Sequence, residues 1–329
     1  MQKMTRKNDG NSNSYNNTLS LQSMVKILQK DGFEVKVNNK QNIIPTHLRH
    51  FSEIDKNCLS FYTEKDSKFL NSKDRYVLIC NSGTENISKK VTYISTSKPK
   101  IAFYRLAQLF KKKSTLKGIH HSSVISPDAK IDASAYIGPN CYIEKCDIKA
   151  NVVLYANVSV YENTTIGKGT IVHSNTTIGV DGVSWGWGPK NQQVYMPNFG
   201  STLIGNNCII GANTTIAKGS LDNTIINSEV NIGHGCKIGH DCKIGEQTFL
   251  STGIALAGGV KIGKRCFVGS GACFKSAIRI VNDIVVGIGS VVVKDCNISE
   301  TVLFGNPSKK LKWTNIYSGL KGLPKREKE

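Results

Sequence analysis

Two adjacent polar residues, His240 and Asp241, are the strongest candidates for chemistry in this sequence. An imidazole with a pKa of about 6.5 can accept a proton at neutral pH, and a carboxylate beside it can orient the ring. A further histidine, His234, lies six residues earlier. The histidines at positions 173, 234 and 240 do not have the spacing of a zinc site, so we expect no bound metal ion.

The ten cysteines indicate neither a zinc ribbon nor a disulfide framework, because no Cys-x-x-Cys pair occurs. Several of them share one phase of the repeat described below, which is typical of small apolar side chains in a reducing compartment. The polar, asparagine-rich start of the chain does not resemble a secretory signal. No apolar run approaches the roughly 18 residues of a membrane-spanning helix. We therefore expect a cytoplasmic protein without a membrane span.

The net charge is strongly positive, with 43 Lys and Arg against 24 Asp and Glu, a balance of +19. Such a balance favours acidic partners, which include nucleic acids, anionic lipids, phosphorylated substrates and acidic proteins. It is also compatible with a solvated basic surface that has no specific partner. The lysines are mostly dispersed and no nucleic-acid-binding motif occurs, so we do not expect a nucleic acid partner.

A six-residue period dominates the sequence from residue 125 onward. Its longest unbroken series is Ile226, Ile232, Ile238, Ile244, Leu250, Leu256, Ile262, Val268, Phe274, Ile280, Val286 and Val292. Glycine often follows the aliphatic residue, and it permits a tight turn. A period of six fits a coil with three short flat faces, each turning one aliphatic side chain inward. We therefore predict a mainly β fold, a left-handed parallel β-helix in which three hexads form each coil.

Two interruptions of the repeat predict projecting loops. Residues 181–202 form an insertion that carries four aromatic residues, Trp185, Trp187, Tyr195 and Phe199. The spacing between Ile216 and Ile226 is ten, so four residues must bulge out there. Loops that project from a rigid solenoid commonly carry binding function, although a solvent-exposed flap is the simpler alternative.

The chain divides into four predicted segments. We expect a disordered N-terminus over 1–17, a small α/β domain over 18–117, the β-helix over 118–296 and a C-terminal extension over 297–329. In the α/β domain, apolar residues have helical spacing near the start and again from about Ala102 to Phe110, with two buried strands between them. After the repeat ends, the sequence FGNPSKKLKW is expected to lead into a short helix or coil.

Longer motifs resemble the UDP-3-O-acylglucosamine N-acyltransferases of lipid A biosynthesis. The resemblance covers about residues 18–295 and is most specific in TTIGVDGVSWG and in VYMPNFGSTLIGNNCIIGANTTIAKGSLDNTII. The stretch IGHDCKIGEQTFLSTGIALAGGVKIG is also similar to bacterial nucleotide-sugar N-acetyltransferases. Both groups are hexapeptide-repeat acyltransferases, so the resemblance implies acyl transfer to a sugar amine.

The resemblance assigns the general base to His240, which would take a proton from the amine as it attacks a thioester carbonyl. It also implies that a glycine amide one coil further on stabilises the oxyanion. Gly258 lies 18 residues after His240, so the two should stack. Asp241 would orient the imidazole ring.

The resemblance also suggests substrate-binding residues. Phe61, with Phe69 as a displaced second aromatic, would stack on the nucleotide base, and a structural role in the core is the alternative for both. Asp181 and Asp222 would contact sugar hydroxyls or the amine, or else stabilise their own loops. The remaining candidates are Lys218 and His234. Consecutive hexads lie on different faces, so His234 and His240 should not converge within one subunit.

Two departures from the lipid A enzymes leave the acyl donor open. Ala277 stands where those enzymes usually carry a second histidine, and Ala217-Lys218 replaces an Asp-Arg pair. The first hypothesis is a lipid-A-type N-acyltransferase of lipopolysaccharide synthesis. The second is a short-chain acyl-CoA or acetyl-CoA-dependent N-acyltransferase acting on a dideoxy-amino nucleotide sugar for surface polysaccharide. A non-catalytic β-helix scaffold is a third, remote reading.

The expected partners follow from the resemblance. They are two further copies of the chain in a homotrimer, a nucleotide-linked amino sugar, and acyl-CoA or acyl-carrier protein as co-substrate. The resemblance implies no bound cofactor. Direct attack of the amine on the thioester would need no reactive cysteine.

Overall fold

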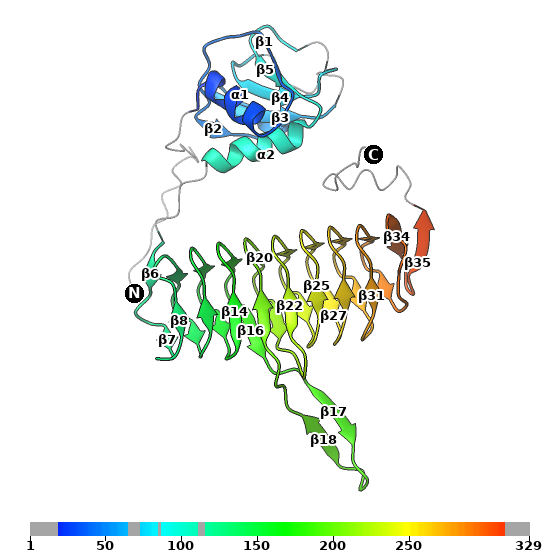
Figure 1. The fold of residues 1–329 in the computed structure, drawn as a ribbon. Helices are drawn as coiled ribbons and strands as arrows, with labels where there is room; N and C mark the ends of the chain where they lie inside the picture. The colour runs from blue at the N-terminus through cyan, green and yellow to red at the C-terminus, as the bar shows by residue number, and fades with distance from the viewer. Residues whose placement is uncertain (1–18, 65–72, 85–86, 111–115, 313–329) are drawn as a thin grey trace, which may run out of the picture. The chain divides into compact units, whose positions relative to one another are not determined.

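The computed structural model describes residues 19–64, 73–84, 87–110 and 116–312. The chain forms two compact units, residues 1–115 and 116–329, and each is described by itself (Figure 1). The predicted disordered segment 1–17 lies outside the described residues, as do Phe69 and the chain beyond residue 312.

The first unit is a five-stranded sheet with two helices and a short 3-10 turn, η1 (Phe51–Glu53). The helices are α1 (Leu21–Lys30) and α2 (Pro99–Phe110). The strands are β1 (Lys36–Asn38), β2 (His47–Leu48), β3 (Cys58–Tyr62), β4 (Val77–Cys80) and β5 (Thr92–Ser95), in the spatial order β1-β5-β4-β3-β2. Only β1 runs antiparallel to its neighbour.

Side-chain alternation along the strands divides the core of this unit between the two faces of the sheet. Leu59 of β3 and Ile79 of β4 pack with Leu106 of α2 on one face. Tyr62 and Leu78 belong to a second apolar cluster. Both helices therefore bury their apolar residues on the first face, while strand and loop residues such as Ile54 and Val91 form the core on the second.

The second unit is the parallel β-helix that the six-residue period predicts (Figure 1). Its first face holds β7 (Val124–Ile125), β10 (Tyr142–Ile143), β13 (Ser159–Val160), β16 (Thr177–Val180), β21 (Thr215–Ala217), β24 (Lys237–Ile238), β27 (Ala255–Leu256), β30 (Cys273–Phe274) and β33 (Val291–Val292). The second holds β8 (Lys130–Ile131), β11 (Asp147–Ile148), β14 (Thr164–Ile166), β19 (Thr202–Ile204), β22 (Thr224–Ile226), β25 (Lys243–Ile244), β28 (Lys261–Ile262) and β31 (Arg279–Ile280). The third holds β6 (Gly118–Ile119), β9 (Tyr136–Ile137), β12 (Val153–Leu154), β15 (Ile171–Val172), β20 (Ile209–Ile210), β23 (Asn231–Ile232), β26 (Phe249–Leu250), β29 (Phe267–Val268), β32 (Val285–Val286), β34 (Thr301–Phe304) and β35 (Lys309–Lys312).

The core of the β-helix is a set of ladders of identical or similar side chains. Ile226, Ile244, Ile262 and Ile280 lie in register on successive coils, and each is buried. Each inward side chain thus packs on the same position of the coils before and after it, which buries a continuous apolar column.

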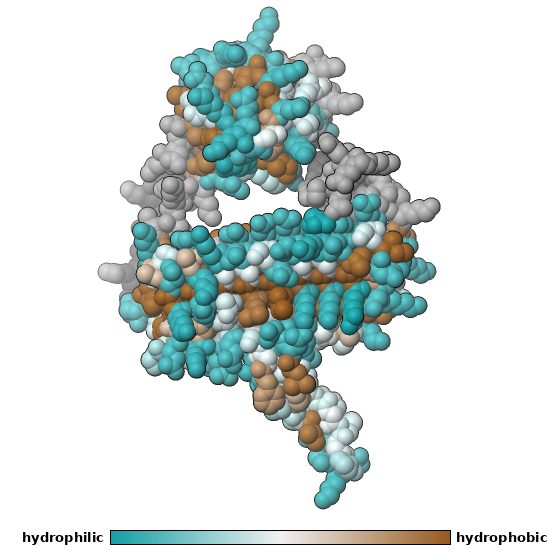
Figure 2. Space-filling model, viewed as in Figure 1, coloured by the Kyte–Doolittle hydropathy of each residue, from teal (hydrophilic) through white to brown (hydrophobic). Residues whose placement is uncertain are grey.

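The insertion after β16 forms an antiparallel hairpin of β17 (Ser184–Trp187) and β18 (Gln193–Met196), which projects away from the β-helix (Figure 1). Its large apolar side chains are exposed, and Trp185 and Trp187 pack edge to face with centroids 5.0 Å apart. Figure 2 shows this apolar surface on the hairpin and a further apolar band along the body of the β-helix.

Residues 301–312 close the β-helix with a hairpin, whereas the helix or coil expected after FGNPSKKLKW lies outside the described residues. β34 pairs in parallel with β32 and then turns back to pair with β35 in antiparallel orientation. The reason is that the last coil leaves an unpaired strand edge, and a hairpin satisfies its backbone groups where a helix would not.

We predict that Gly211→Ala lowers the free energy of unfolding by about 1–3 kcal/mol through overpacking between coils. A Cβ atom at Gly211 would lie 2.4 Å from the carbonyl carbon of Gly233 on the next coil. Gly186→Ala is the control, because nothing lies within 4 Å of a Cβ atom there. Urea unfolding measures both variants, and equal stability of the two would contradict the prediction.

Candidate active site

One corner of the β-helix gathers the candidate residues from four successive coils. We call the turn between the first and second faces corner 1. It carries the hairpin insertion between β16 and β19, the loop 218–223 between β21 and β22, and the pair His240–Asp241 between β24 and β25. Gly258 occupies the next turn, between β27 and β28. Because successive coils stack in register, these segments lie side by side.

The His240 ring lies between two glycines. A Cβ atom at Gly258 would lie 2.5 Å from both Cε1 and Nε2 of the ring, and one at Gly182 would lie 3.0 Å from Cδ2. Any larger residue at position 258 would displace the imidazole. The predicted proximity of His240 and Gly258 is therefore observed. The His240 side chain keeps 28% of its surface exposed, so a substrate can reach it.

Asp241 holds one edge of the ring. Its Oδ2 atom lies 2.8 Å from His240 Nδ1. The Ser220 backbone N–H donates to Oδ1 at 2.8 Å, and the Ser220 hydroxyl donates to Oδ2. Asp241 has a left-handed backbone, with φ of 59°, at the turn where the chain leaves the first face. The loop that the ten-residue spacing predicts thus supplies the groups that fix this carboxylate.

The electrostatics of Asp241 favour the carboxylate form. Burial raises its pKa, but the hydrogen bonds from Ser220 and His240 outweigh burial and leave the pKa below its usual value. A carboxylate only accepts hydrogen bonds, so Nδ1 of a neutral His240 carries the ring proton. Nε2 is then the basic atom.

Ser184, at the start of β17, is a site residue that sequence reasoning missed. Its hydroxyl oxygen lies 3.1 Å from His240 Nε2. The insertion breaks the six-residue period, so no spacing relates Ser184 to His240. The only available signal was the insertion itself, which the sequence marks as a projecting loop.

Gly258 is the residue whose backbone amide we expect to donate to an oxyanion. Within the described residues it has no hydrogen-bond acceptor, whereas the next amide, of Gly259, donates to the His240 carbonyl at 2.8 Å. The Gly258 carbonyl accepts from Ala277 at 2.9 Å. The free N–H is therefore on a residue whose backbone both flanking coils hold in place.

Lys218 and Asp181 interact with each other. Lys218 is buried, and its Nζ lies 2.8 Å from Asp181 Oδ1 and 3.7 Å from Glu162 Oε1. This ion pair links the root of the hairpin to the first face. Asn198, also buried, donates to the Lys218 carbonyl at 3.2 Å.

Neither Asp222 nor His234 contacts the His240 ring in the described part of the structure. Asp222 is exposed and accepts from Lys243 Nζ at 2.5 Å, and this hydrogen bond lowers its pKa. His234 lies at the corner between the third and first faces, where its Nδ1 accepts from the Ala212 N–H at 2.8 Å. As predicted, His234 and His240 do not converge within the chain.

Phe61 lies on β3 of the first unit and packs against two aromatic residues of α2. Its ring centroid is 4.9 Å from that of Phe103 and 6.3 Å from that of Tyr104. Phe61 is partly buried and Tyr104 is exposed. The second predicted aromatic, Phe69, is among the residues that the structure does not describe.

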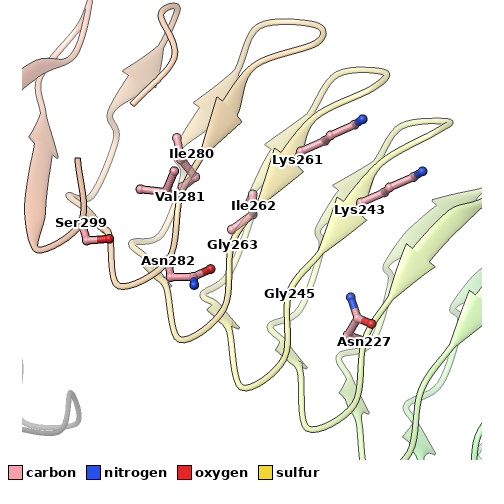
Figure 3. Close-up of a pocket in the computed structure, with 10 residues that line it drawn as sticks. All are labelled: Asn227, Lys243, Gly245, Lys261, Ile262, Gly263, Ile280, Val281, Asn282 and Ser299. Carbon is pink, nitrogen blue, oxygen red and sulfur yellow. The ribbon is translucent and has the colours of Figure 1, made fainter. Parts of the chain in front are cut away.

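A shallow groove of about 390 Å³ crosses the second face beyond corner 1 (Figure 3). Figure 3 shows the side chains of Lys243 and Lys261 extended in parallel from adjacent strands, with Asn227 and Asn282 on the same groove. Arg279 lies in register with these lysines on the next strand. The lining of the groove thus includes two lysines, of which Lys243 is paired with Asp222, together with polar and aliphatic residues.

The thiol and metal chemistry of the described residues is limited. No three His, Cys, Asp or Glu side chains in the described ranges form a group that could hold a metal ion. Cys242, beside Asp241, is buried, and burial raises the pKa of its thiol to about 12. It is therefore not a thiolate nucleophile.

Among the described helices, none is long and apolar enough to cross a bilayer.

Known proteins resemble part of this chain. Residues 145–179 match the family model described as bacterial transferase hexapeptide (six repeats). A UDP-3-O-acylglucosamine N-acyltransferase from Polynucleobacter asymbioticus is 31% identical over 182 residues, which are 47% of this chain and 50% of that protein. One from Marinomonas sp. is 35% identical over 197 residues, 51% of this chain and 57% of that protein. The chain thus spans about half the length of these relatives.

Solved structures agree on the fold. The crystal structure of UDP-N-acetylglucosamine O-acyltransferase from Moraxella catarrhalis has a TM-score of 0.56 at 27% identity and covers 63% of this chain and 79% of that one. UDP-N-acetylglucosamine acyltransferase from Francisella novicida has the same TM-score at 26% identity, covering 63% and 75%. This chain is therefore a hexapeptide-repeat protein with a left-handed parallel β-helix, and it resembles the UDP-3-O-acylglucosamine N-acyltransferases.

Proposed function

We propose that this protein is an N-acyltransferase that moves an acyl group from a thioester donor to the amine of a nucleotide-linked amino sugar, in lipid A synthesis. The observation that carries the proposal is the His240 imidazole, oriented by Asp241 and placed beside the free amide of Gly258. The relatives named above are acyltransferases that act on nucleotide-linked sugars.

The geometry supports proton transfer through His240 Nε2. Because Asp241 accepts from Nδ1, the basic electron pair is on Nε2, where it accepts from the Ser184 hydroxyl. An attacking amine that takes the place of this hydroxyl can pass its proton to Nε2. The tetrahedral intermediate places negative charge on the former carbonyl oxygen, and in this proposal the Gly258 N–H donates to it. Asp241 stabilises the imidazolium that forms.

The basic groove supports a substrate that carries phosphate. Lys243, Lys261 and Arg279 form three adjacent positions of the second face, and Asp222 offsets part of their charge through Lys243. Both acyl-CoA and phosphopantetheine on acyl-carrier protein contain phosphate, and so does a nucleotide sugar. We propose that this groove receives phosphate from one of these substrates.

The aromatic cluster of the first unit supports binding of a nucleotide base. Phe61 and its neighbours on α2 present a partly exposed aromatic surface. Stacking on a planar base would use this surface, in line with the role that the resemblance implies for Phe61. Asp181, which is more than half exposed beside Lys218, remains our candidate for contact with a sugar hydroxyl. We propose the same kind of contact for Asp222. His234 would lie next to the substrate.

We further propose a cytoplasmic homotrimer. The outward residues of the third face are largely apolar, and the stacked rings of Phe249 and Phe267 lie on it with centroids 5.4 Å apart. An exposed apolar face of this kind favours association with copies of the chain. All ten cysteines are free thiols, which supports a reducing compartment.

The second candidate is transfer of a short acyl group from acyl-CoA to a dideoxy-amino sugar. Ala277 favours it, because this residue, one coil beyond Gly258, has no side chain able to act on the donor. Competition between acyl-CoA and acyl-carrier protein as donors distinguishes the two candidates.

We expect His240→Ala to slow amide formation by about two to four orders of magnitude while the fold is retained, because the base is lost. His121→Ala is the matched control, since His121 is an exposed histidine on the first coil. Mass spectrometry of the acylated sugar measures the rate. Undiminished activity would remove the base assignment, and an inactive wild type with all amino-sugar nucleotides tested would favour a scaffold.

Asp241→Asn should lower the melting temperature at neutral pH, and its difference from the wild type should shrink in acid. The folded-state pKa of Asp241 is depressed, so its stabilisation is fully present above its ordinary value of 3.8. It is lost as the pH falls through the lower folded-state pKa. Asp128→Asn, at an exposed turn, is the control. A difference that is unchanged between pH of about 7 and about 3 would contradict this account.

Lys261→Glu should raise KM for the phosphate-bearing substrate several-fold with little change in kcat, because a negative charge would repel phosphate in the groove. Lys130→Glu is matched to it, since Lys130 occupies the equivalent outward position at the far end of the second face. The comparison should be repeated at high salt, where the difference should narrow. Equal KM values for the two variants would place the phosphate elsewhere.

A further inference from the structure

Ser220 contacts both oxygens of the carboxylate that orients the His240 ring. Its backbone N–H donates to Asp241 Oδ1 at 2.8 Å, and its hydroxyl donates to Oδ2. Oδ2 is also the atom that lies 2.8 Å from His240 Nδ1. One carboxylate oxygen therefore accepts from the serine hydroxyl and from the ring at the same time.

Two donors on one oxygen share its negative charge. A hydrogen bond to a carboxylate stabilises its charge, and the stabilised oxygen attracts a neighbouring positive charge less strongly. With the Ser220 hydroxyl on Oδ2, Asp241 therefore stabilises an imidazolium less than it would alone. His240 then holds a proton less firmly, and more of it stays neutral. Only the neutral ring can accept a proton from an amine.

The position of Ser220 does not depend on its hydroxyl. The Phe199 N–H, from the returning side of the hairpin, donates to the Ser220 carbonyl at 2.7 Å. Two residues earlier in the loop, the Lys218 N–H donates to the Val180 carbonyl at 2.9 Å. Loss of the hydroxyl would leave these bonds and the backbone bond to Asp241 Oδ1 in place. The effect of the hydroxyl can thus be separated from the course of the loop.

The other ionisable side chains of the segments packed near the ring are paired or uncharged. They form two ion pairs, Asp181 with Lys218 and Asp222 with Lys243, and one buried thiol, Cys242. Burial raises the pKa of that thiol to about 12, so it is uncharged at neutral pH. The turn 257–259 carries only alanine and glycine. Within the described ranges, Asp241 is therefore the charged group whose hydrogen bond reaches the ring.

We propose that Ser220 is a positioning residue that fixes the Asp241 carboxylate against His240 and sets how firmly the ring holds a proton. The inference rests on the proposed function for the role of His240 as the base. It gives the loop 218–223 a part in setting the pH range over which the protein can work.

The test follows protonation of the ring in the full-length protein labelled with isotopic histidine. NMR records the Cε1–H signals through a pH series, and His240→Ala identifies the signal of His240. We expect Ser220→Ala to move the midpoint of this titration upward by about half a pH unit or more. Ser220→Thr keeps a hydroxyl and should titrate like the wild type. A midpoint that stays in place or moves down in Ser220→Ala overturns the inference.

Ser134→Ala is the matched control. Ser134 also donates its N–H and its hydroxyl to one carboxylate, that of Asp132, at 2.9 and 2.6 Å, near the start of the β-helix. Its loss should leave the His240 signal unchanged.

A second comparison tests whether the effect passes through the carboxylate. In an Asp241→Asn background, Ser220→Ala should not move the midpoint, because the charge that the hydroxyl modulates is gone. A shift as large as in the wild-type background would contradict this route and overturn the inference.

Kinetics separates failure of the inference from failure of the proposed function. Ser220→Ala should move the acid limb of the kcat/KM profile to higher pH by the amount that NMR measures, with a plateau within about threefold of the wild type. A lower plateau with an unmoved limb would indicate a purely structural role and overturn the inference, while the proposed function stands. A moved midpoint in a protein that acylates no amino-sugar nucleotide would support the role of Ser220 and contradict the proposed function.

Discussion

Hydrogen bonds between successive coils keep each corner of the β-helix directly beside the same corner of its neighbours. At the coil that carries His240, the Lys237 N–H donates to the Ile254 carbonyl at 2.8 Å and the Gly239 N–H donates to the Leu256 carbonyl at 2.9 Å. This register, repeated along all three faces, brings residues 18 positions apart into contact. The proximity of His240 and Gly258 is a consequence of it. A shift of one residue in either coil would turn inward side chains outward and separate the two.

The same register explains why so little of the site depends on side-chain packing. The His240 ring rests on Gly258 and Gly182, and the loop that fixes Asp241 comes from the coil before it. Each of these segments is short and is anchored at both ends by a strand. A histidine, a carboxylate and a free amide can therefore be held in place without a buried pocket, at an open corner that a large substrate can reach.

The sequence predicted the parts of the protein that obey the six-residue period. The faces, the inward ladder that includes Ile244, the proximity of His240 to Gly258 and the separation of His234 all follow from counting. What lies off the period was not predictable in this way. Ser184 is on the insertion, so its contact with His240 depends on how the hairpin folds back. The ion pair of Asp181 with Lys218 has the same origin, because it joins two interruptions of the repeat.

The C-terminal hairpin shows a second limit of sequence patterns. The residues of β35 include three lysines and have no six-residue period, so they did not suggest a strand. They pair with β34 because the end of a parallel sheet offers unpaired backbone groups. A segment pairs at the edge of a sheet because that edge is otherwise unpaired, and the strand preferences of its own residues do not reveal this.

The hairpin insertion disturbs the pairing on the side where it begins, since the register of β16 with β21 shifts between Ile178 and Val180. The pairing of the strand that follows it is regular. Thr164 pairs with Thr202 across it as regularly as Ile244 pairs with Ile262 across an ordinary coil. Lengthening a connection whose ends are already fixed costs little chain entropy. Corner 1 can thus acquire or lose segments in the course of evolution while the solenoid persists unaltered. Proteins of this kind that recognise different substrates are then expected to differ mainly in the length and composition of this one turn. The coils that support it would stay the same.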